Sequence, residues 1–260
     1  MQLAKLKCLA AFDRLCKDNG LVYWLDFGTL LGAVRHGGFI PWDDDLDVGM
    51  PRADYEKLES IARALPEKGF VWRYFNRGFL QAYWEGDGFG FQCLDVFPFD
   101  AYSKKMSFQE IRDFKARIRP VSDRMTNKWK KIQKNPKVKE SKIFGTDRER
   151  DFIRDKVLDG KVPAADGTLF SLNLSFVFYN RDWVFPLSEI EFEGMRFPSP
   201  ANPGAILESQ YGNFYQYPDD IAGLHKLLSE SIKEQVRMEK EYDGFLALDD
   251  DALYEIMTGK

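Results

Sequence analysis

The stretch "LDFGTLLGAVRHGGFIPWDDDLDVGM", residues 25–50, contains the densest cluster of acidic residues next to a segment that is expected to form part of the core. Within it, four carboxylates fall between residues 43 and 47, directly before an apolar run. Side chains in a strand alternate between its two faces, so Asp45 and Asp47 would point one way while their apolar neighbours point into the core. The pattern therefore predicts two carboxylates side by side on one strand face.

Two such carboxylates favour a bound cation. Unit charges about 4 Å apart repel each other by roughly 4 kcal/mol at an effective dielectric constant near 20. A divalent cation would turn this repulsion into binding energy. Hard oxygen ligands favour Mg²⁺, with Mn²⁺ as a substitute, and no histidine stands at a spacing that favours zinc. Asp45 and Asp47 are therefore candidate metal ligands in a site for phosphoryl transfer.

A candidate phosphate-binding element precedes the acids. Gly28 and Thr29 lie where a β-prone segment ends and a short helix begins. A helix N-terminus offers free backbone N–H groups, and glycine lets a phosphate approach the backbone closely. Arg35, at the other end of this helix, is a further candidate phosphate contact, with a surface charge in a turn as the alternative.

A third acid follows in "QCLDVFPF", where Asp95 is flanked by apolar residues in a β-prone segment. If its strand is a neighbour of the strand that carries Asp47, the carboxylates come together. Asp95 is therefore the candidate general base or third metal ligand.

Runs of acids also occur in helix caps, calcium loops and turns. "LDDDALYEIM", with Asp249 to Asp251, has the pattern of a helix N-cap. A calcium loop starting at Asp43 would need glycine where Val48 stands. Asp43 and Asp44 are expected to be turn residues after Pro41 and Trp42.

Periodicity along the chain predicts an α/β (α+β) fold, with a mixed sheet and flanking helices. Apolar residues recur every three or four positions in residues 3–18, which indicates an amphipathic helix. We expect three regions: residues 1–100 as the catalytic core, 101–160 as a basic helical insertion, and 161–260 as a strand and helix region that completes the domain.

Charge is unevenly distributed over the 260 residues, whose net charge is −4. Residues 104–161 hold 19 Lys and Arg against 9 Asp and Glu. This segment is either a solvated helical surface or a cationic wall facing a phosphorylated ligand. The overall pI of 5.4 argues against nucleic acid as a partner.

The cysteines and the apolar runs predict a cytoplasmic protein. Three cysteines without a C-x-x-C pair suggest neither a disulfide framework nor a zinc site, so each is expected to be a small buried hydrophobe. The first residues lack the unbroken apolar stretch of a signal peptide. The longest uncharged run, residues 167–180, is too short and polar to cross a membrane, so no transmembrane segment is expected.

Three motifs together resemble the LicD family of phosphotransferases, which includes the fukutin-related proteins. "FGTLLGAVRHGGFIPWDDDLDVGMPRADYEKL" resembles the family signature, "CLDVFPFD" its second motif, and "FEGMRFPSPANPGAILESQYGNF" its C-terminal motif. The resemblance implies a nucleotidyltransferase-like fold, in which Gly28 and Thr29 hold a phosphate and Asp45, Asp47 and Asp95 form an acidic triad.

The resemblance also implies an activity. Members transfer a phospho-alcohol from a CDP-linked donor, such as CDP-choline, CDP-glycerol or CDP-ribitol, to a sugar hydroxyl and release CMP. The acceptor would be a cell-surface glycan such as a teichoic acid or its lipid-linked precursor, which would bring the protein to the inner face of the membrane. Two alternatives stay open: a nucleotidyltransferase that uses an NTP and releases pyrophosphate, and a non-catalytic glycan-binding module.

Overall fold

A computed structural model describes residues 1–43, 45–65, 69–75, 79–85, 90–102, 107, 109–110, 112–113, 116, 167–171, 177–217 and 242–259. The expected basic insertion of residues 101–160 therefore lies almost entirely outside the described residues. Residues 218–241, within the expected C-terminal strand and helix region, lie outside them as well. The three-region division of the chain stays a prediction.

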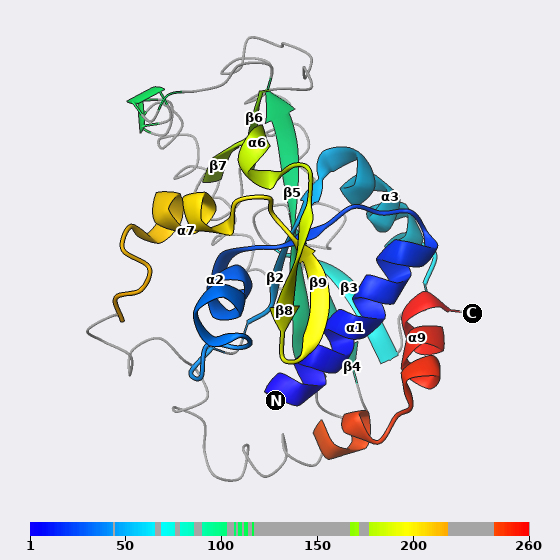
Figure 1. Ribbon diagram of the computed structural model, residues 1–260. Helices are drawn as coiled ribbons and strands as arrows, with labels where there is room; N and C mark the ends of the chain where they lie inside the picture. Colours follow the sequence, from blue (N-terminus) through cyan, green and yellow to red (C-terminus); the bar gives the residue numbers. More distant parts are fainter. Residues whose placement is uncertain are drawn as a thin grey trace, which may run out of the picture.

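A mixed sheet forms the centre of the molecule (Figure 1). Its main path runs β1-β2-β5-β4-β3, and only β2 and β5 are parallel among these neighbours. The end of β5 continues into an antiparallel pairing with β6, which pairs with β7. The strands span Trp24–Leu25 (β1), Asp47–Pro51 (β2), Gly69–Phe75 (β3), Phe79–Glu85 (β4), Gly90–Tyr102 (β5), Thr168–Ser171 (β6) and Val177–Asn180 (β7). This mixed sheet with flanking helices confirms the predicted α+β class.

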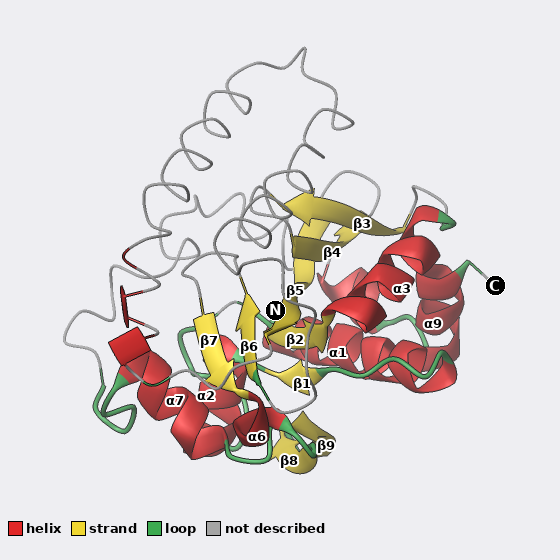
Figure 2. Cartoon of the chain, turned by 90° about the horizontal axis from the view of Figure 1, so that it is seen from above, coloured by secondary structure: helices red, strands yellow, loops and turns green. Residues whose placement is uncertain are grey.

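Helices flank the sheet in two groups. Figure 2 shows α1, α3 and α9 gathered on one side, and α2, α6 and α7 on the other. A separate hairpin, β8 and β9, lies with the second group, and β8 contacts α2. The bounds are Gln2–Asp18 (α1), Phe27–His36 (α2), Arg52–Arg63 (α3), Arg181–Val184 (α6), Pro203–Tyr211 (α7), Asp250–Thr258 (α9), Ser188–Phe192 (β8) and Met195–Ser199 (β9).

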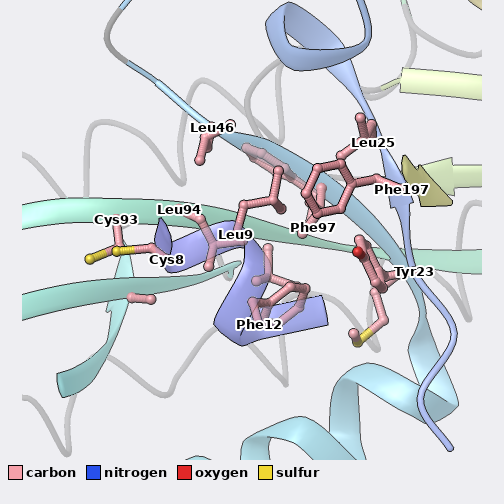
Figure 3. Packing of buried hydrophobic residues seen from close by; sticks show 14 of the residues in the cluster. Cys8, Leu9, Phe12, Tyr23, Leu25, Leu46, Cys93, Leu94, Phe97 and Phe197 are labelled. Carbon is pink, nitrogen blue, oxygen red and sulfur yellow. The ribbon is translucent and has the colours of Figure 1, made fainter. Parts of the chain in front are cut away.

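The helix predicted at residues 3–18 buries its apolar stripe on the sheet. Leu9 and Phe12 of α1 are fully buried, and Figure 3 shows Leu9 beside Leu94 of β5. Cys8 lies next to Cys93 in the same view. All three cysteines are free and buried, which confirms their expected role as small core residues.

Local signals at helix ends were largely correct. Gly37 ends α2 in the left-handed conformation, with φ of 72°, which glycine adopts without strain. The Asp249 side chain caps α9 by accepting a hydrogen bond from the Ala252 N–H at 2.6 Å, so the second acidic triplet is a helix cap. No helix of the described residues is both long and apolar enough to span a membrane.

Candidate active site

Asp47 and Asp95 occupy matching positions in the two parallel strands β2 and β5. Paired residues of neighbouring strands point to the same face, so the two carboxylates lie side by side. Phe97, two residues after Asp95, shares this face and packs against Phe27 in α2, with 4.8 Å between the two ring centroids. The acids therefore face the α2 side of the sheet. The expectation that the strand of Asp95 is a neighbour of the Asp47 strand is confirmed.

Asp45 differs from the sequence-based expectation. Strand β2 begins at Asp47, so Asp45 precedes the strand and its side chain is exposed. The prediction that strand alternation places Asp45 and Asp47 on one strand face is therefore wrong. The turn that carries Asp45 starts with a hydrogen bond from the Asp43 N–H to the Ile40 carbonyl at 2.8 Å. The Leu46 carbonyl still accepts a hydrogen bond from the Asp95 N–H at 2.7 Å, and β2 begins at the next residue.

Asp43 combines two functions in the structure. Its Oδ1 accepts a hydrogen bond from the Asp45 N–H at 3.3 Å, which is the turn role predicted for it. Its Oδ2 faces the start of α2, 2.8 Å from the position that a Cβ on Gly28 would occupy. Sequence reasoning assigned Asp43 to the turn alone and missed this second contact. The neighbouring Asp44 lies outside the described residues.

Burial and nearby carboxylates raise the pKa values of Asp47 and Asp95. Burial raises the pKa of Asp47 well above its usual range, and the negative charges of Asp95 and Asp45 raise it further. Burial likewise raises the pKa of Asp95 to about 7, and the charge of Asp45 adds to this effect. The buried ammonium of Lys5 acts in the opposite direction on Asp95. Near neutral pH the pair of carboxylates is therefore stabilised either by a bound proton or by a cation.

Two glutamines anchor Asp95, and sequence reasoning missed both. Gln81 of β4 and Gln92 of β5 donate to the same atom, Asp95 Oδ1, at 2.7 and 2.6 Å. These bonds favour the charged form of Asp95. Among the described residues both donors bind Oδ1, which leaves Oδ2 for a further ligand. A polar amide inside an otherwise apolar strand is the signal that could have identified them.

An irregularity in the sheet explains how Gln92 reaches Asp95. Residues three positions apart in a regular strand point to opposite faces. Between β4 and β5 the register shifts, so that Ala82 pairs with Leu94 while Tyr83 pairs with Gln92. The extra residue in β5 turns the strand locally, and Gln92 comes to the face of Asp95. The bulge thus shapes the candidate site.

The start of α2 is fixed by a buried carboxylate, Asp26. Its Oδ1 accepts hydrogen bonds from the Phe27 N–H at 2.8 Å and the Tyr179 hydroxyl at 2.7 Å. Its Oδ2 accepts from the Trp24 indole N–H at 3.2 Å. Burial raises the pKa of Asp26 to about 6, although these hydrogen bonds lower it. Sequence reasoning did not identify this residue.

The first residue of α2 is strained. Phe27 has a φ of 45°, in the left-handed region that a bulky side chain rarely adopts. Such strain persists only where the surroundings hold the backbone in place, and here Asp26 binds the Phe27 N–H directly. The conformation sets the direction in which the helix N-terminus points beside the acids.

Gly28 and Thr29 lie at this helix start, as predicted. A Cβ on Gly28 would lie 3.7 Å from Asp47 Oδ2, so the glycine leaves open the space beside both Asp43 and Asp47. The Thr29 hydroxyl accepts a hydrogen bond from the Asp47 N–H at 2.8 Å and so ties α2 to β2. The phosphate-binding role of both residues stays a prediction.

Arg35 lies near the other end of α2. Its Nη1 donates to the Phe214 carbonyl at 3.1 Å, and its guanidinium lies over the Tyr217 ring, 4.9 Å from the centroid. Tyr211, at the end of α7, has a pKa raised by burial and by the charge of Asp47, and lowered by Arg35. Arg35 and Asp47 thus have opposite effects on the pKa of this tyrosine. The phosphate contact predicted for Arg35 stays a prediction.

The donor set fits a magnesium ion that is completed by a substrate. Among the residues that the structure describes, no three His, Cys, Asp or Glu side chains are close enough to form a ready-made metal cage. Mg²⁺ usually takes one or two carboxylates together with substrate phosphates and waters. Asp47 and Asp95 supply two adjacent carboxylates of raised pKa, so their chemistry suits such an ion. The role of Asp45 as a further metal ligand stays a prediction.

One protein family matches the region that carries this site. The family, described as LicD/FKTN/FKRP, nucleotidyltransferase domain, matches residues 20–123. That segment includes α2, the acidic turn, β2 and β5.

Named relatives match shorter stretches. The lipopolysaccharide cholinephosphotransferase LicD of Haemophilus influenzae is 48% identical over 60 residues, 23% of each chain. The human ribitol 5-phosphate transferase FKRP is 47% identical over 58 residues, 20% of this chain and 12% of that protein. The yeast mannosyltransferase regulator 4 is 42% identical over 43 residues, 16% of this chain and 4% of that protein. The alignments thus span less than a quarter of the length of these curated relatives.

Proposed function

We propose that the chain, whose residues 20–123 match the LicD/FKTN/FKRP nucleotidyltransferase domain, is a metal-dependent phosphotransferase. The reaction would move a phospho-alcohol from a CDP-linked donor to a sugar hydroxyl of a glycan or of its lipid-linked precursor, with release of CMP. Two similar proteins, a cholinephosphotransferase and a ribitol 5-phosphate transferase, support this reaction class by their names. A lipid-linked acceptor would place the reaction at the inner face of a membrane.

A single observation carries the proposal: Asp47 and Asp95 are paired across parallel strands, directly beside the N-terminus of α2. Free N–H groups of a helix N-terminus attract phosphate oxygens. Paired carboxylates would repel the same phosphates unless a cation lay between them. The combination therefore suits a phosphate substrate that arrives with a divalent metal.

The roles of the acids follow from their surroundings. Asp47, with the exposed Asp45 as a candidate partner, would hold Mg²⁺ against the donor pyrophosphate. The ion would neutralise the charge that builds up on the pyrophosphate oxygens. Gly28 leaves room for a phosphate at the helix start. Arg35 would contact the phosphate of the departing CMP.

Asp95 is the proposed general base. Its pKa of about 7 suits proton transfer near neutral pH, and the two glutamines on Oδ1 leave Oδ2 to face the acceptor. The acceptor hydroxyl would form a bond to the distal phosphorus and give its proton to Asp95. The bond from that phosphorus to the CMP oxygen breaks, and CMP leaves with the electron pair.

The test is a release assay with the full chain. We would incubate the protein with Mg²⁺, sugar acceptors and a panel of CDP-alcohols and NTPs, and measure CMP and pyrophosphate separately, with EDTA as the metal control. Asp47→Asn should lower CMP release by at least about 100-fold. Glu191→Gln, the same change of charge on the exposed strand β8, should leave the rate unchanged. Turnover that persists in EDTA, or in Asp47→Asn, would contradict the mechanism.

Metal binding separates the two candidate roles of Asp95. If Asp95 is the general base, Asp95→Asn should abolish turnover and leave the affinity for Mn²⁺ unchanged, as measured by electron paramagnetic resonance. If Asp95 is a third metal ligand, the same variant should also bind Mn²⁺ about tenfold or more weakly.

The alternatives predict different products. The matching domain is described as a nucleotidyltransferase, so release of pyrophosphate from an NTP, with no CMP from CDP-alcohols, would favour that activity. One relative is named as a regulator, and binding of a glycan without either product would favour a non-catalytic module.

A further inference from the structure

Three rings form a partly exposed cluster beside the candidate active site. His36, Trp42 and Tyr217, here called the aromatic wall, pack edge to face or tilted against one another. The centroid distances are 6.3 Å between His36 and Trp42, 6.1 Å between His36 and Tyr217, and 5.8 Å between Trp42 and Tyr217. Tyr217 is 53% exposed. Aromatic rings that pack against one another and are partly exposed can stack on a flat ligand.

A cation without a carboxylate partner lies against this wall. The Arg35 guanidinium lies over the Tyr217 ring at 4.9 Å, and among the described residues no carboxylate forms an ion pair with it. Its Nε atom is buried with no hydrogen-bond partner in the described part of the chain. A buried donor without a partner costs free energy unless a ligand satisfies it. Arginine suits phosphate because its planar donors match phosphate oxygens.

The wall is connected to the acids by the chain itself. Trp42 directly precedes Asp43, whose Oδ2 faces Gly28 at the start of α2. Arg35 lies seven residues after Gly28, which places both on the same face of α2. A ligand whose phosphates lie at the acids can therefore extend along this face of the helix and reach the wall.

We propose that the aromatic wall and Arg35 bind the nucleoside monophosphate half of the donor, with the base stacked on Trp42 and Tyr217 and the phosphate on Arg35. In a nucleotide, one ribose ring separates the phosphate from the base. A cation that lies against an aromatic ring can therefore bind the phosphate while the aromatic ring stacks on the base. The His36 Nδ1, buried without a partner among the described residues, would be a further polar contact of this ligand. This inference rests on the proposed transfer from a nucleoside diphosphate donor.

Other ligands fit the wall less well. A quaternary ammonium group would meet the positive charge of Arg35 on the face of Tyr217. A neutral sugar ring would leave the unpaired Arg35 Nε unsatisfied. The nucleotide satisfies both features, and it leaves the β4 and β5 side, with Gln81 and Asp95, for the alcohol and the acceptor.

Direct binding of CMP and cytidine tests the inference without turnover. Calorimetry on the full chain should show Tyr217→Leu weakening both ligands by about tenfold, since base stacking contributes on that order. Arg35→Met should weaken CMP and leave cytidine unchanged, because cytidine lacks the phosphate. Tyr217→Phe keeps the ring and should bind both as the unmodified chain does. Tyr215→Leu is the matched control, an exposed tyrosine of the same segment outside the wall.

The outcomes separate this inference from the proposed function. No measurable CMP binding by the unmodified chain, or equal CMP binding by Tyr217→Leu, overturns the inference. CMP binding that depends on Tyr217 without any CMP release from CDP-alcohols supports the wall and contradicts the proposed reaction. CMP release with an unchanged KM for the donor in Tyr217→Leu supports the reaction and contradicts the wall.

Discussion

Asp47 and Asp95 are register partners in the parallel strand pair of the main sheet path, and the Thr29 hydroxyl binds the Asp47 N–H beside them. Parallel pairing places both carboxylates on one face, where burial and the charge of Asp45 raise the pKa of each, and the charge of Asp95 raises that of Asp47 further. The helix that follows Asp26 points its N-terminus at the same place. Buried like charges at this face cost stability unless a proton or a cation lies between them.

The metal-free protein should lose stability as the pH rises from about 4 to about 7. The pKa of Asp95 is raised from 3.8 to about 7 in the fold, so in this window the folded chain binds more protons than the unfolded chain. Asp95→Asn should therefore match the unmodified protein at pH 4.5 and exceed its free energy of unfolding at pH 8 by about 1 to 4 kcal/mol. Urea unfolding in EDTA at both pH values measures this. A variant that is less stable at pH 8 would contradict the prediction.

The glutamine anchors should set the pH at which Asp95 becomes a base. The Gln81 amide favours the charged form of Asp95. In Gln81→Met the pKa of Asp95 rises, so the acidic limb of the kcat/KM profile should move to higher pH by about one unit. Gln92→Met should shift it less. Gln109→Met, on an exposed helical position, is the control. A lower rate at every pH with an unmoved limb would mean that Gln81 only shapes the strand.

Much of the fold was predictable from local patterns. The apolar periodicity of α1 and the cap at Asp249 are each determined within a few residues. The acid in "QCLDVFPF" was predicted to be a site residue because a carboxylate is rarely found inside an apolar strand without a partner.

The features that were missed depend on distant partners. Asp26 is bound by Tyr179, 153 residues away, and no local pattern links the two. Gln92 faces Asp95 only because the register shifts beside Tyr83. Asp45 was assigned to β2 because alternation alone cannot show where a strand begins. Strand ends and bulges are determined by pairing, which a sequence pattern does not contain.

The Tyr179 hydroxyl should matter more at high pH than at low pH. Its hydrogen bond favours the charged form of Asp26, whose pKa is about 6. Tyr179→Phe should therefore reduce the free energy of unfolding by about 1 to 2 kcal/mol at pH 8, and by less at pH 5, where Asp26 is protonated. Turnover should also fall, because Asp26 holds the start of α2.

Tyr23→Phe is the matched control, a buried tyrosine that donates to Asp13 at 2.8 Å. It should lower stability and leave the KM for the donor unchanged. Equal destabilisation of Tyr179→Phe at both pH values would show that the charge of Asp26 is not involved.

Gly28→Ala should separate stability from activity. Alanine in a helix is favoured over glycine by up to about 1 kcal/mol, so the variant should unfold at an equal or higher temperature. The new Cβ would lie 2.8 Å from Asp43 Oδ2, and the carboxylate must move away from the helix start. CMP release should then fall by about tenfold or more, because a group that lies beside the reacting phosphate is displaced. Gly204→Ala in α7 is the control, since its Cβ would meet only Asn202 Oδ1 at 3.7 Å. If Gly28→Ala keeps full activity, the space beside Asp43 and Asp47 does not hold the phosphate.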